Sequence, residues 1–323
     1  MTRAGPPRSG VALAGLLGVM TLAPGCSGGS AAVRTAAASS APHADPVSTA
    51  LQQERAAMSP AVRAACSADN AWHPSLSAAS RRAAEEILDG FERAGIAIAA
   101  EQRAAAVDIA RKRVFWWVVR TMLVGARLHN AGMVELPSVR TAGGAPLRVY
   151  RTAFTPTPDA PSSCVHALLS AGGVRHIVNL YAGPMTTSDL EHAERAAVES
   201  AGGTYQNARD DAEAAHWREQ VRDGDDPRQA MLAVARIVRE HVLRPGGNAP
   251  RGHVQVHCGG GMHRTGMVMG VIERCLAGAS MEAVQARYKA HVGWRSEAEP
   301  GGYEAANIEF IRTFDCALVQ PAR

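Results

Sequence analysis

The fold is decided by the stretch His253-Val254-Gln255-Val256-His257-Cys258-Gly259-Gly260-Gly261-Met262-His263-Arg264-Thr265-Gly266. Its first five residues predict a short buried strand, three glycines follow, and an apolar pattern with helical spacing resumes over Thr265 to Cys275. A strand that runs through a glycine-rich turn into a helix is an anion-binding arrangement. The reason is that N–H groups at a helix N-terminus lack partners within the helix and lie at the positive end of its dipole.

Reactive groups stand on this turn at a spacing that suits phosphate. The same N–H groups and dipole that attract an anion stabilise a negative sulfur, so we expect Cys258 to be a thiolate nucleophile near neutral pH. Arg264, six positions later, carries a planar guanidinium that can hold two phosphoryl oxygens. The residues expected to surround the phosphate are Gly259, Gly260, Gly261, Met262, His263 and Arg264.

Residues His257 to Thr265 resemble the HCxxGxxR[S/T] active-site loop of the protein tyrosine phosphatase superfamily at every fixed position. The resemblance is to bacterial tyrosine and dual-specificity phosphatases, and it extends more loosely over Val134 to Phe314. It implies hydrolysis of phosphomonoesters on phosphotyrosine or phosphoserine/threonine proteins, with no metal or other cofactor. It gives roles to four side chains of the loop: Cys258 as the nucleophile that forms a phosphocysteine, Arg264 as phosphate ligand, His257 as the residue that orders the loop, and Thr265 as an aid to thiolate departure.

The resemblance also implies an aspartate on a separate loop that protonates the leaving oxygen. In the family this acid follows the strand before the long helix that leads to the cysteine, and here that strand is expected at Thr204 to Ala208. Asp210 is therefore our first choice and Asp211 the second. Asp210 lies 48 residues before Cys258, farther than is usual in the family, which an insertion over 212–224 would explain. The alternatives nearer to the cysteine are Asp223, Asp225 and Asp226.

After Gly132 short apolar strands alternate with amphipathic helices, which is typical of α/β proteins with mostly parallel strands. Together with the resemblance, this pattern predicts a cysteine-phosphatase fold whose central sheet is flanked by helices, preceded by an N-terminal helical accessory region. Strands are expected at Leu147–Tyr150, His176–Leu180, Thr204–Ala208 and His253–His257. Helices are expected at Ser188–Ala201, at Asp226–Leu243 with Asp226 as N-cap, at Thr265–Cys275 and at Tyr303–Phe314, where Asn307 is a weak candidate for positioning water against an exposed-surface alternative.

The first 25 residues have the pattern of an export signal, with two arginines before an apolar run that is too short to span a membrane. Small residues before Cys26 resemble the lipobox of bacterial lipoproteins, although Ala23 stands where that motif usually has leucine. We therefore expect a lipoprotein anchored at Cys26 that faces the periplasm or cell exterior, the alternative being a cleaved secretory signal. The expected organisation is 1–25 export signal, 26–48 flexible tether, 49–132 helical accessory region and 133–323 phosphatase-like domain.

Charge and cysteine content narrow the partners and the compartment. Loss of the two signal arginines lowers the formal charge from +4 to +2, which is too small for a nucleic-acid surface. Four further cysteines could pair in an exported protein, and spacing does not choose among the three pairings. The four are Cys66, Cys164, Cys275 and Cys316, and one of the last three could also protect Cys258 by reversible pairing.

Several alternatives remain open from the residues alone. The loop carries no lysine and His263 is its one extra cation, so inositol phosphates or phosphoinositides are less favoured substrates. A catalytically silent phosphate-binding module and a sulfur-transfer or arsenate-reducing enzyme would use a similar loop. A zinc site from His253, His257, Cys258 and His263 has no closed tetrahedral spacing. Val114–Val119 is expected to be a packed helix rather than an interfacial membrane helix.

Overall fold

The computed structural model describes residues 46–66, 72–110, 129–154, 163–181, 188–208, 217–224, 226–292 and 303–320. All of them belong to one of the chain's two compact units, Ala44–Arg323. The export signal, Cys26, the 114–119 segment, Asp210 and Asp211 lie outside the described residues. No helix within the described ranges is both long and apolar enough to cross a membrane.

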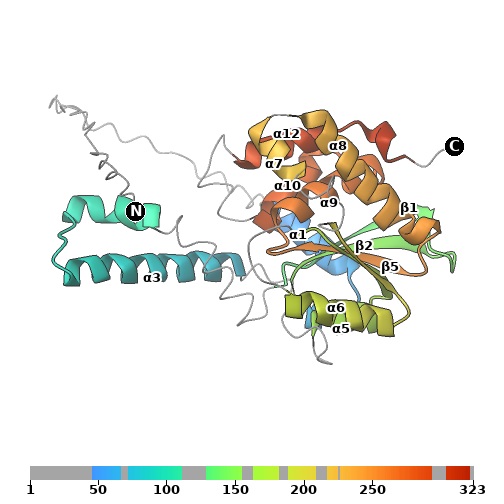
Figure 1. Ribbon diagram of the computed structural model, residues 1–323, viewed down its shortest axis with the longest axis horizontal. Helices are drawn as coiled ribbons and strands as arrows, with labels where there is room; N and C mark the ends of the chain where they lie inside the picture. The colour runs from blue at the N-terminus through green and yellow to red at the C-terminus, as the bar shows by residue number, and fades with distance from the viewer. Residues whose placement is uncertain are drawn as a thin grey trace, which may run out of the picture. The chain divides into compact units, whose positions relative to one another are not determined.

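A five-stranded sheet with the order β1-β2-β5-β3-β4 forms the centre of the molecule (Figure 1). β1 pairs with β2 in antiparallel fashion, whereas β2, β5, β3 and β4 run parallel to one another. The expected α/β fold with a mostly parallel central sheet is confirmed. The strand bounds are Gly132–Arg140 for β1, Pro146–Ala153 for β2, Val174–Asn179 for β3, Thr204–Asn207 for β4 and His253–Cys258 for β5.

Helices cover both faces of this sheet, as its alternating side chains require. On β3, Ile177 joins a core cluster with residues of α2, α5 and α6, whereas the next residue, Val178, joins the cluster of α8, α9, α10 and α12. Figure 1 shows α5 and α6 on one side of the sheet and α8 and α9 on the other. The helix bounds are α5 Cys164–Ser170, α6 Ser188–Ser200, α7 Trp217–Asp223, α8 Pro227–Arg236, α9 His263–Cys275, α10 Met281–Val292 and α12 Tyr303–Thr313.

The helix expected over Asp226–Leu243 has two parts. Asp226 caps α8, because its carboxylate accepts a hydrogen bond from Gln229 N at 3.0 Å and Pro227 occupies the first turn. From Ile237 to Leu243 the chain continues as a π-helix rather than an α-helix. The predicted cap is therefore confirmed, and the change of helix type was not foreseen.

The first helices of the described chain are part of the sheet domain. α1 (Pro46–Ala57) contacts β1 and α10, and α2 (Pro60–Ala65) contacts α5. α3 (Trp72–Arg93) forms a small cluster with residues 98–110, centred on Ala84, Leu88 and Val107. The helical character of this part of the chain is as expected, but α1 and α2 help to build the domain that holds the site.

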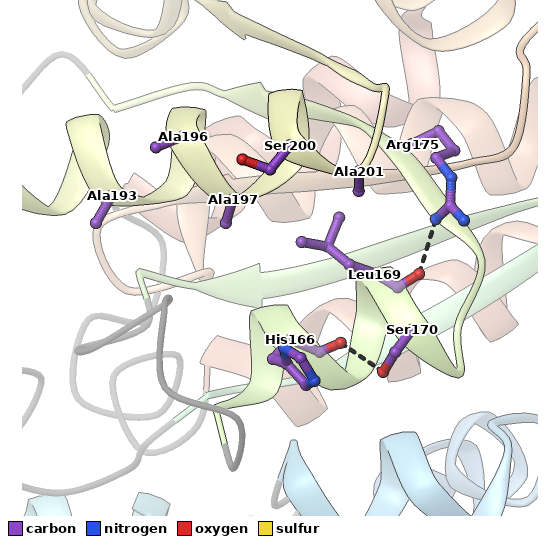
Figure 2. A pocket seen from close by; sticks show the side chains of 9 residues that line it. All are labelled: His166, Leu169, Ser170, Arg175, Ala193, Ala196, Ala197, Ser200 and Ala201. Carbon is purple, nitrogen blue, oxygen red and sulfur yellow. Dashed lines mark hydrogen bonds between the residues drawn. The ribbon is translucent and has the colours of Figure 1, made fainter.

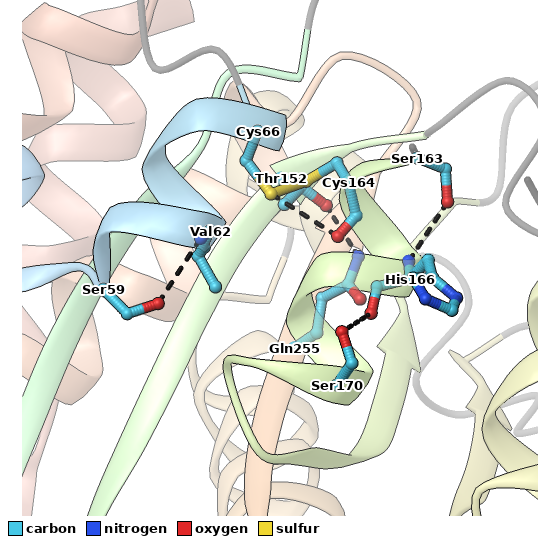
Figure 3. Close-up of a disulfide and its surroundings, with 9 residues drawn as sticks. All are labelled: Ser59, Val62, Cys66, Thr152, Ser163, Cys164, His166, Ser170 and Gln255. Atoms are coloured by element: carbon cyan, nitrogen blue, oxygen red, sulfur yellow. Dashed lines mark hydrogen bonds between the residues drawn. A yellow bond between two sulfur atoms is a disulfide. The ribbon is translucent and has the colours of Figure 1, made fainter. Parts of the chain in front are cut away.

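Two disulfides cross-link the domain. Cys66, which caps the C-terminus of α2, is bonded to Cys164 of α5 (Figure 3), and Cys275 at the end of α9 is bonded to Cys316. These two bonds resolve the pairing that the sequence left open. They also leave Cys258 as the free thiol among the described cysteines, so none of the other four remains available for the reversible pairing suggested above.

Candidate functional site

The cysteine loop lies where three parallel strands end. Cys258 is the last residue of β5 and pairs in register with Ala153 of β2, while His257 pairs with Asn179 of β3. Because parallel strands place their carboxyl ends at the same edge of a sheet, this edge is where an open α/β sheet binds ligands. Cys258 is only 6% exposed there.

The carbonyl groups of the loop are held from outside. Gly259 O accepts a hydrogen bond from Phe154 N at 3.3 Å, and Gly260 O accepts one from Asn130 Nδ2 at 3.1 Å. Gly261 O accepts from Asn130 Nδ2 at 3.2 Å and from the guanidinium of Arg151 at 2.6 Å. In a trans peptide unit the N–H points opposite to the carbonyl. The N–H groups that follow these three carbonyls therefore point to the other side of the loop, the arrangement that binds an anion.

Gly261 is a residue of this turn that no other amino acid could replace without strain. Its φ angle is +64°, in the left-handed region, and a Cβ there would lie 2.5 Å from the carbonyl oxygen of Thr152 and 2.7 Å from Ala153 N. A Cβ at Gly260 would approach only the Met262 side chain, with Cε at 2.7 Å, which is flexible. The loop thus fits against β2 through Gly261.

The N-terminus of α9 completes the loop. Met262 occupies the N-cap position without a side-chain hydrogen bond, and the first helical bond runs from Gly266 N to Met262 O at 2.7 Å. The N–H groups of the first turn have no partner within the helix. Arg264 and Thr265 stand on that turn, and Oγ1 of Thr265 is buried with no hydrogen-bond partner in the described part of the chain. His263 and Met262 are buried as well.

His257 lies beside a buried carboxylate that the sequence did not reveal. Its Nε2 lies 3.1 Å from Oε2 of Glu194 in α6, and both side chains are fully buried. Its ring also meets Phe154 edge to face at 4.7 Å. Glu194 accepts a hydrogen bond from the hydroxyl of Tyr205, whose pKa is raised by burial and by this carboxylate. α6 therefore brings a buried carboxylate next to His257.

A second set of buried side chains, those of Asn130, His291 and Glu54, lies next to the loop. Asn130, which holds two loop carbonyls, also bonds His291 of α10, and His291 in turn bonds Glu54 of α1. Arg151 is buried beside them, and burial lowers its pKa while the charges of Glu54, Glu273 and Cys258 act in the opposite direction. Sequence reasoning missed this group because its members are separated by up to 237 positions.

The aspartates proposed as general acid are not all visible. Asp210, Asp211 and Asp225 lie outside the described residues, as does the side chain of Asp223. Asp226 is engaged as the N-cap of α8. The choice of Asp210 therefore stays a prediction, and Asp226 has a structural role.

The structure also bears on Asn307 and on the zinc alternative at His253. Asn307 is not an exposed residue of α12, since it is 2% exposed and donates a hydrogen bond to the hydroxyl of Tyr288 at 2.8 Å. His253 is not a free ligand, since its Nδ1 accepts a hydrogen bond from Arg148 N at 3.2 Å. Among the described residues no three His, Cys, Asp or Glu side chains are grouped to hold a metal ion.

A separate hollow of about 680 Å³ lies between α5 and α6 (Figure 2). Its base is formed mainly by small residues, and no residue of the cysteine loop lines it. Two of its polar side chains are already engaged, because Arg175 Nη1 donates to Leu169 O and Ser170 Oγ donates to His166 O, each at 2.7 Å. The hollow is therefore separate from the cysteine loop.

No known family model matches the chain, and no curated protein is similar to it. Among solved structures it is similar to the crystal structure of P. aeruginosa TpbA, with 19% sequence identity and a TM-score of 0.26. The similarity covers 53% of this chain and 83% of that one. A likeness of this size carries no inference about residues, so the candidate site is defined by its own geometry.

Proposed function

We propose that the protein hydrolyses phosphomonoesters through a phosphocysteine formed on Cys258. The observation that carries this proposal is the set of loop carbonyls held outward by Phe154, Asn130 and Arg151, which directs the following N–H groups to the other side. Such N–H groups and the α9 N-terminus stabilise both a thiolate and a bound phosphoryl group. Arg264 on the first turn of α9 is the residue that would hold two phosphoryl oxygens.

The reaction would proceed in two displacements at phosphorus. In the first, the Cys258 sulfur forms a bond to phosphorus as the bond to the leaving oxygen breaks, and an aspartic acid protonates that oxygen. In the second, the aspartate takes a proton from water, the water oxygen bonds to phosphorus, and the S–P bond breaks to release inorganic phosphate and the thiolate. The buried hydroxyl of Thr265 would donate a hydrogen bond to the departing sulfur.

We assign the proton transfer to Asp210, with Asp211 as the alternative. Both follow β4, whose last residue, Asn207, is paired with Asn179 at the sheet edge that also carries His257. Asp226 is less suited, because a carboxylate that caps α8 is committed to the N–H of Gln229.

The expected substrates are phosphotyrosine or phosphoserine/threonine proteins, or small phosphomonoesters. Arg151 donates to the outer side of the loop, at Gly261 O, and so would not meet further phosphates. That arrangement favours simple phosphomonoesters over inositol phosphates or phosphoinositides. We also propose an exported enzyme held at the membrane through Cys26. Its two disulfides favour an oxidising compartment.

Hydrolysis of p-nitrophenyl phosphate by the full-length mature protein tests this function. Mass spectrometry should first establish a free Cys258 thiol and two intact disulfides. Turnover in the natural protein and its loss in Cys258→Ser would support the proposal. Binding of inorganic phosphate without turnover would favour the silent phosphate-binding module. Turnover that depends on a thiosulfate or arsenate substrate and a thiol partner would favour sulfur transfer or arsenate reduction.

A further inference from the structure

A chain of buried polar groups links α1 to the cysteine loop. Oε2 of Glu54 lies 2.6 Å from Nε2 of His291, and Nδ1 of His291 lies 2.8 Å from Oδ1 of Asn130. Asn130 Nδ2 then donates to the carbonyls of Gly260 and Gly261. The side chains of Glu54, His291 and Asn130 are all buried.

We propose that Glu54 and His291 are positioning residues for the phosphate loop, acting through Asn130. This inference rests on the proposed function, since it concerns how the same loop is kept ready for phosphate. It makes α1, at the start of the sheet domain, part of the apparatus that prepares the site.

The hydrogen-bond directions along the chain are fixed by chemistry. Asn130 uses its amide nitrogen on carbonyl oxygens, so its Oδ1 must accept, and the proton between it and His291 belongs to Nδ1 of the ring. The other ring nitrogen then shares a proton with Glu54. Whether that proton sits on nitrogen or on oxygen, the contact holds the ring, and the ring holds the Asn130 amide toward the loop.

The surrounding backbone is shaped to accommodate this chain. Asn130 has a φ of +45°, a left-handed conformation that asparagine tolerates better than most residues. A Cβ at Gly132 would lie 2.5 Å from Oε2 of Glu54 and 3.0 Å from Nε2 of His291. The absence of a side chain at Gly132 therefore leaves the space that the Glu54–His291 contact occupies.

The burial of Glu54 is costly and points to a use for it. Its Oε1 is buried with no hydrogen-bond partner among the described residues, which costs stability. Burial, followed by the nearby Arg151, lowers the pKa of His291, and the Glu54 carboxylate opposes this shift in part. An apolar side chain at position 54 would avoid this loss of stability but could not hold the His291 ring.

Three variants of α1 separate positioning from packing. Glu54→Ala removes the contact with His291, whereas Glu54→Gln keeps it, because a carboxamide can donate to Nε2 of the neutral ring. Leu51→Ala is the matched control, since Leu51 is buried in α1 and takes no part in the chain of polar groups. Each variant is prepared as the whole chain after the expected export signal. Its thermal midpoint of unfolding is recorded, and Cys258 is verified as a thiol.

The first readout is the affinity for inorganic phosphate by titration calorimetry. We expect Glu54→Ala to weaken it about tenfold, the equivalent of one lost hydrogen bond to the loop. Glu54→Gln should stay within about twofold of the natural protein. Leu51→Ala should lower the thermal midpoint and keep the affinity. Equal affinity in a folded Glu54→Ala protein, or equal losses in Glu54→Ala and Leu51→Ala, would overturn the proposal.

The second readout separates this inference from the proposed function. If the natural protein binds phosphate but does not hydrolyse p-nitrophenyl phosphate, and only Glu54→Ala loses binding, the positioning role stands and hydrolysis does not. If hydrolysis is present and Glu54→Ala retains both kcat and KM, hydrolysis stands and the positioning role falls. A natural protein that binds no phosphate would overturn the positioning role as well.

Discussion

Oε2 of Glu194 lies 3.1 Å from Nε2 of His257, and neither side chain reaches solvent. Removing the Glu194 carboxylate leaves the buried Tyr205 hydroxyl without its acceptor, and a buried polar group without a partner usually costs about 1 to 3 kcal/mol. We therefore expect Glu194→Ala to lower the free energy of unfolding by about that amount and to reduce kcat/KM, because His257 precedes the nucleophile. Denaturant titration and steady-state kinetics measure the two effects.

The control for this prediction lies on the same helix. Glu199 of α6 is exposed, and its carboxylate lies 3.9 Å from the guanidinium of Arg195. Such surface ion pairs contribute little to stability. Glu199→Ala should change the free energy of unfolding by less than about 0.5 kcal/mol. If Glu194→Ala behaves like Glu199→Ala, the Glu194–His257 contact has no supporting role.

Gly261→Ala should damage the loop far more than Gly260→Ala. The first substitution adds a methyl group in a left-handed conformation and against the backbone of Thr152, whereas the second meets only the flexible end of Met262. We expect Gly261→Ala to lose phosphate binding at least tenfold more than Gly260→Ala, which corresponds to about 1.4 kcal/mol. Calorimetric titration with phosphate provides the comparison, and equal affinities would show that the turn can shift away from β2.

Substitution of two aspartates separates catalysis from capping. Asp210→Ala should lower kcat by about 10²- to 10⁴-fold. It should also remove the optimum of the rate at acidic pH, because the rate no longer depends on a protonated carboxyl group. Asp226→Ala should keep turnover and cost about 1 kcal/mol of stability through the lost N-cap of α8. Rate measurements across mildly acidic to neutral pH decide the matter. The opposite pattern would place the acid at Asp226.

The strand, loop and helix around Cys258 could be predicted from sequence because their signals are local. The glycines, the apolar β5 pattern and the resumed helical spacing are contiguous, and the structure has β5 at His253–Cys258 and α9 at His263–Cys275. The same holds for the Asp226 cap. These features depend on neighbours within a few residues, and a single sequence displays such neighbours directly.

The supports of the loop could not be predicted because they depend on tertiary contacts. Glu194 and Glu54 stand on amphipathic helices where an acidic residue normally faces water, and only the fold turns them inward toward His257 and His291. Asn307 was misjudged for the same reason. No local pattern distinguishes a buried carboxylate from an exposed one, and hydrogen-bond partners this far apart in sequence give no spacing to read.

The final prediction concerns acid stability. His176 of β3 is buried, with Nδ1 2.8 Å from Thr204 Oγ1 and Nε2 accepting a hydrogen bond from Arg251 N at 3.1 Å. Since Nε2 accepts, Nδ1 carries the proton of the neutral ring. Burial, and then Arg251, lower the pKa of His176 to about 4 from a usual 6.5. Protonation would force a second N–H against the backbone N–H of Arg251.

A depressed pKa means that the unfolded chain binds this proton more readily than the folded protein. The contribution of His176 to stability is therefore complete above about pH 6.5 and is lost as the pH falls toward about 4. His176→Gln keeps an acceptor for Arg251 N but does not titrate. We expect its unfolding free energy to decline less steeply between these pH values than that of the natural protein, by about 2 to 3 kcal/mol in total. Urea titrations at several pH values measure this decline. If the unfolding free energy of both proteins declined equally with pH, the His176 ring would already be charged in the folded state or exposed to water.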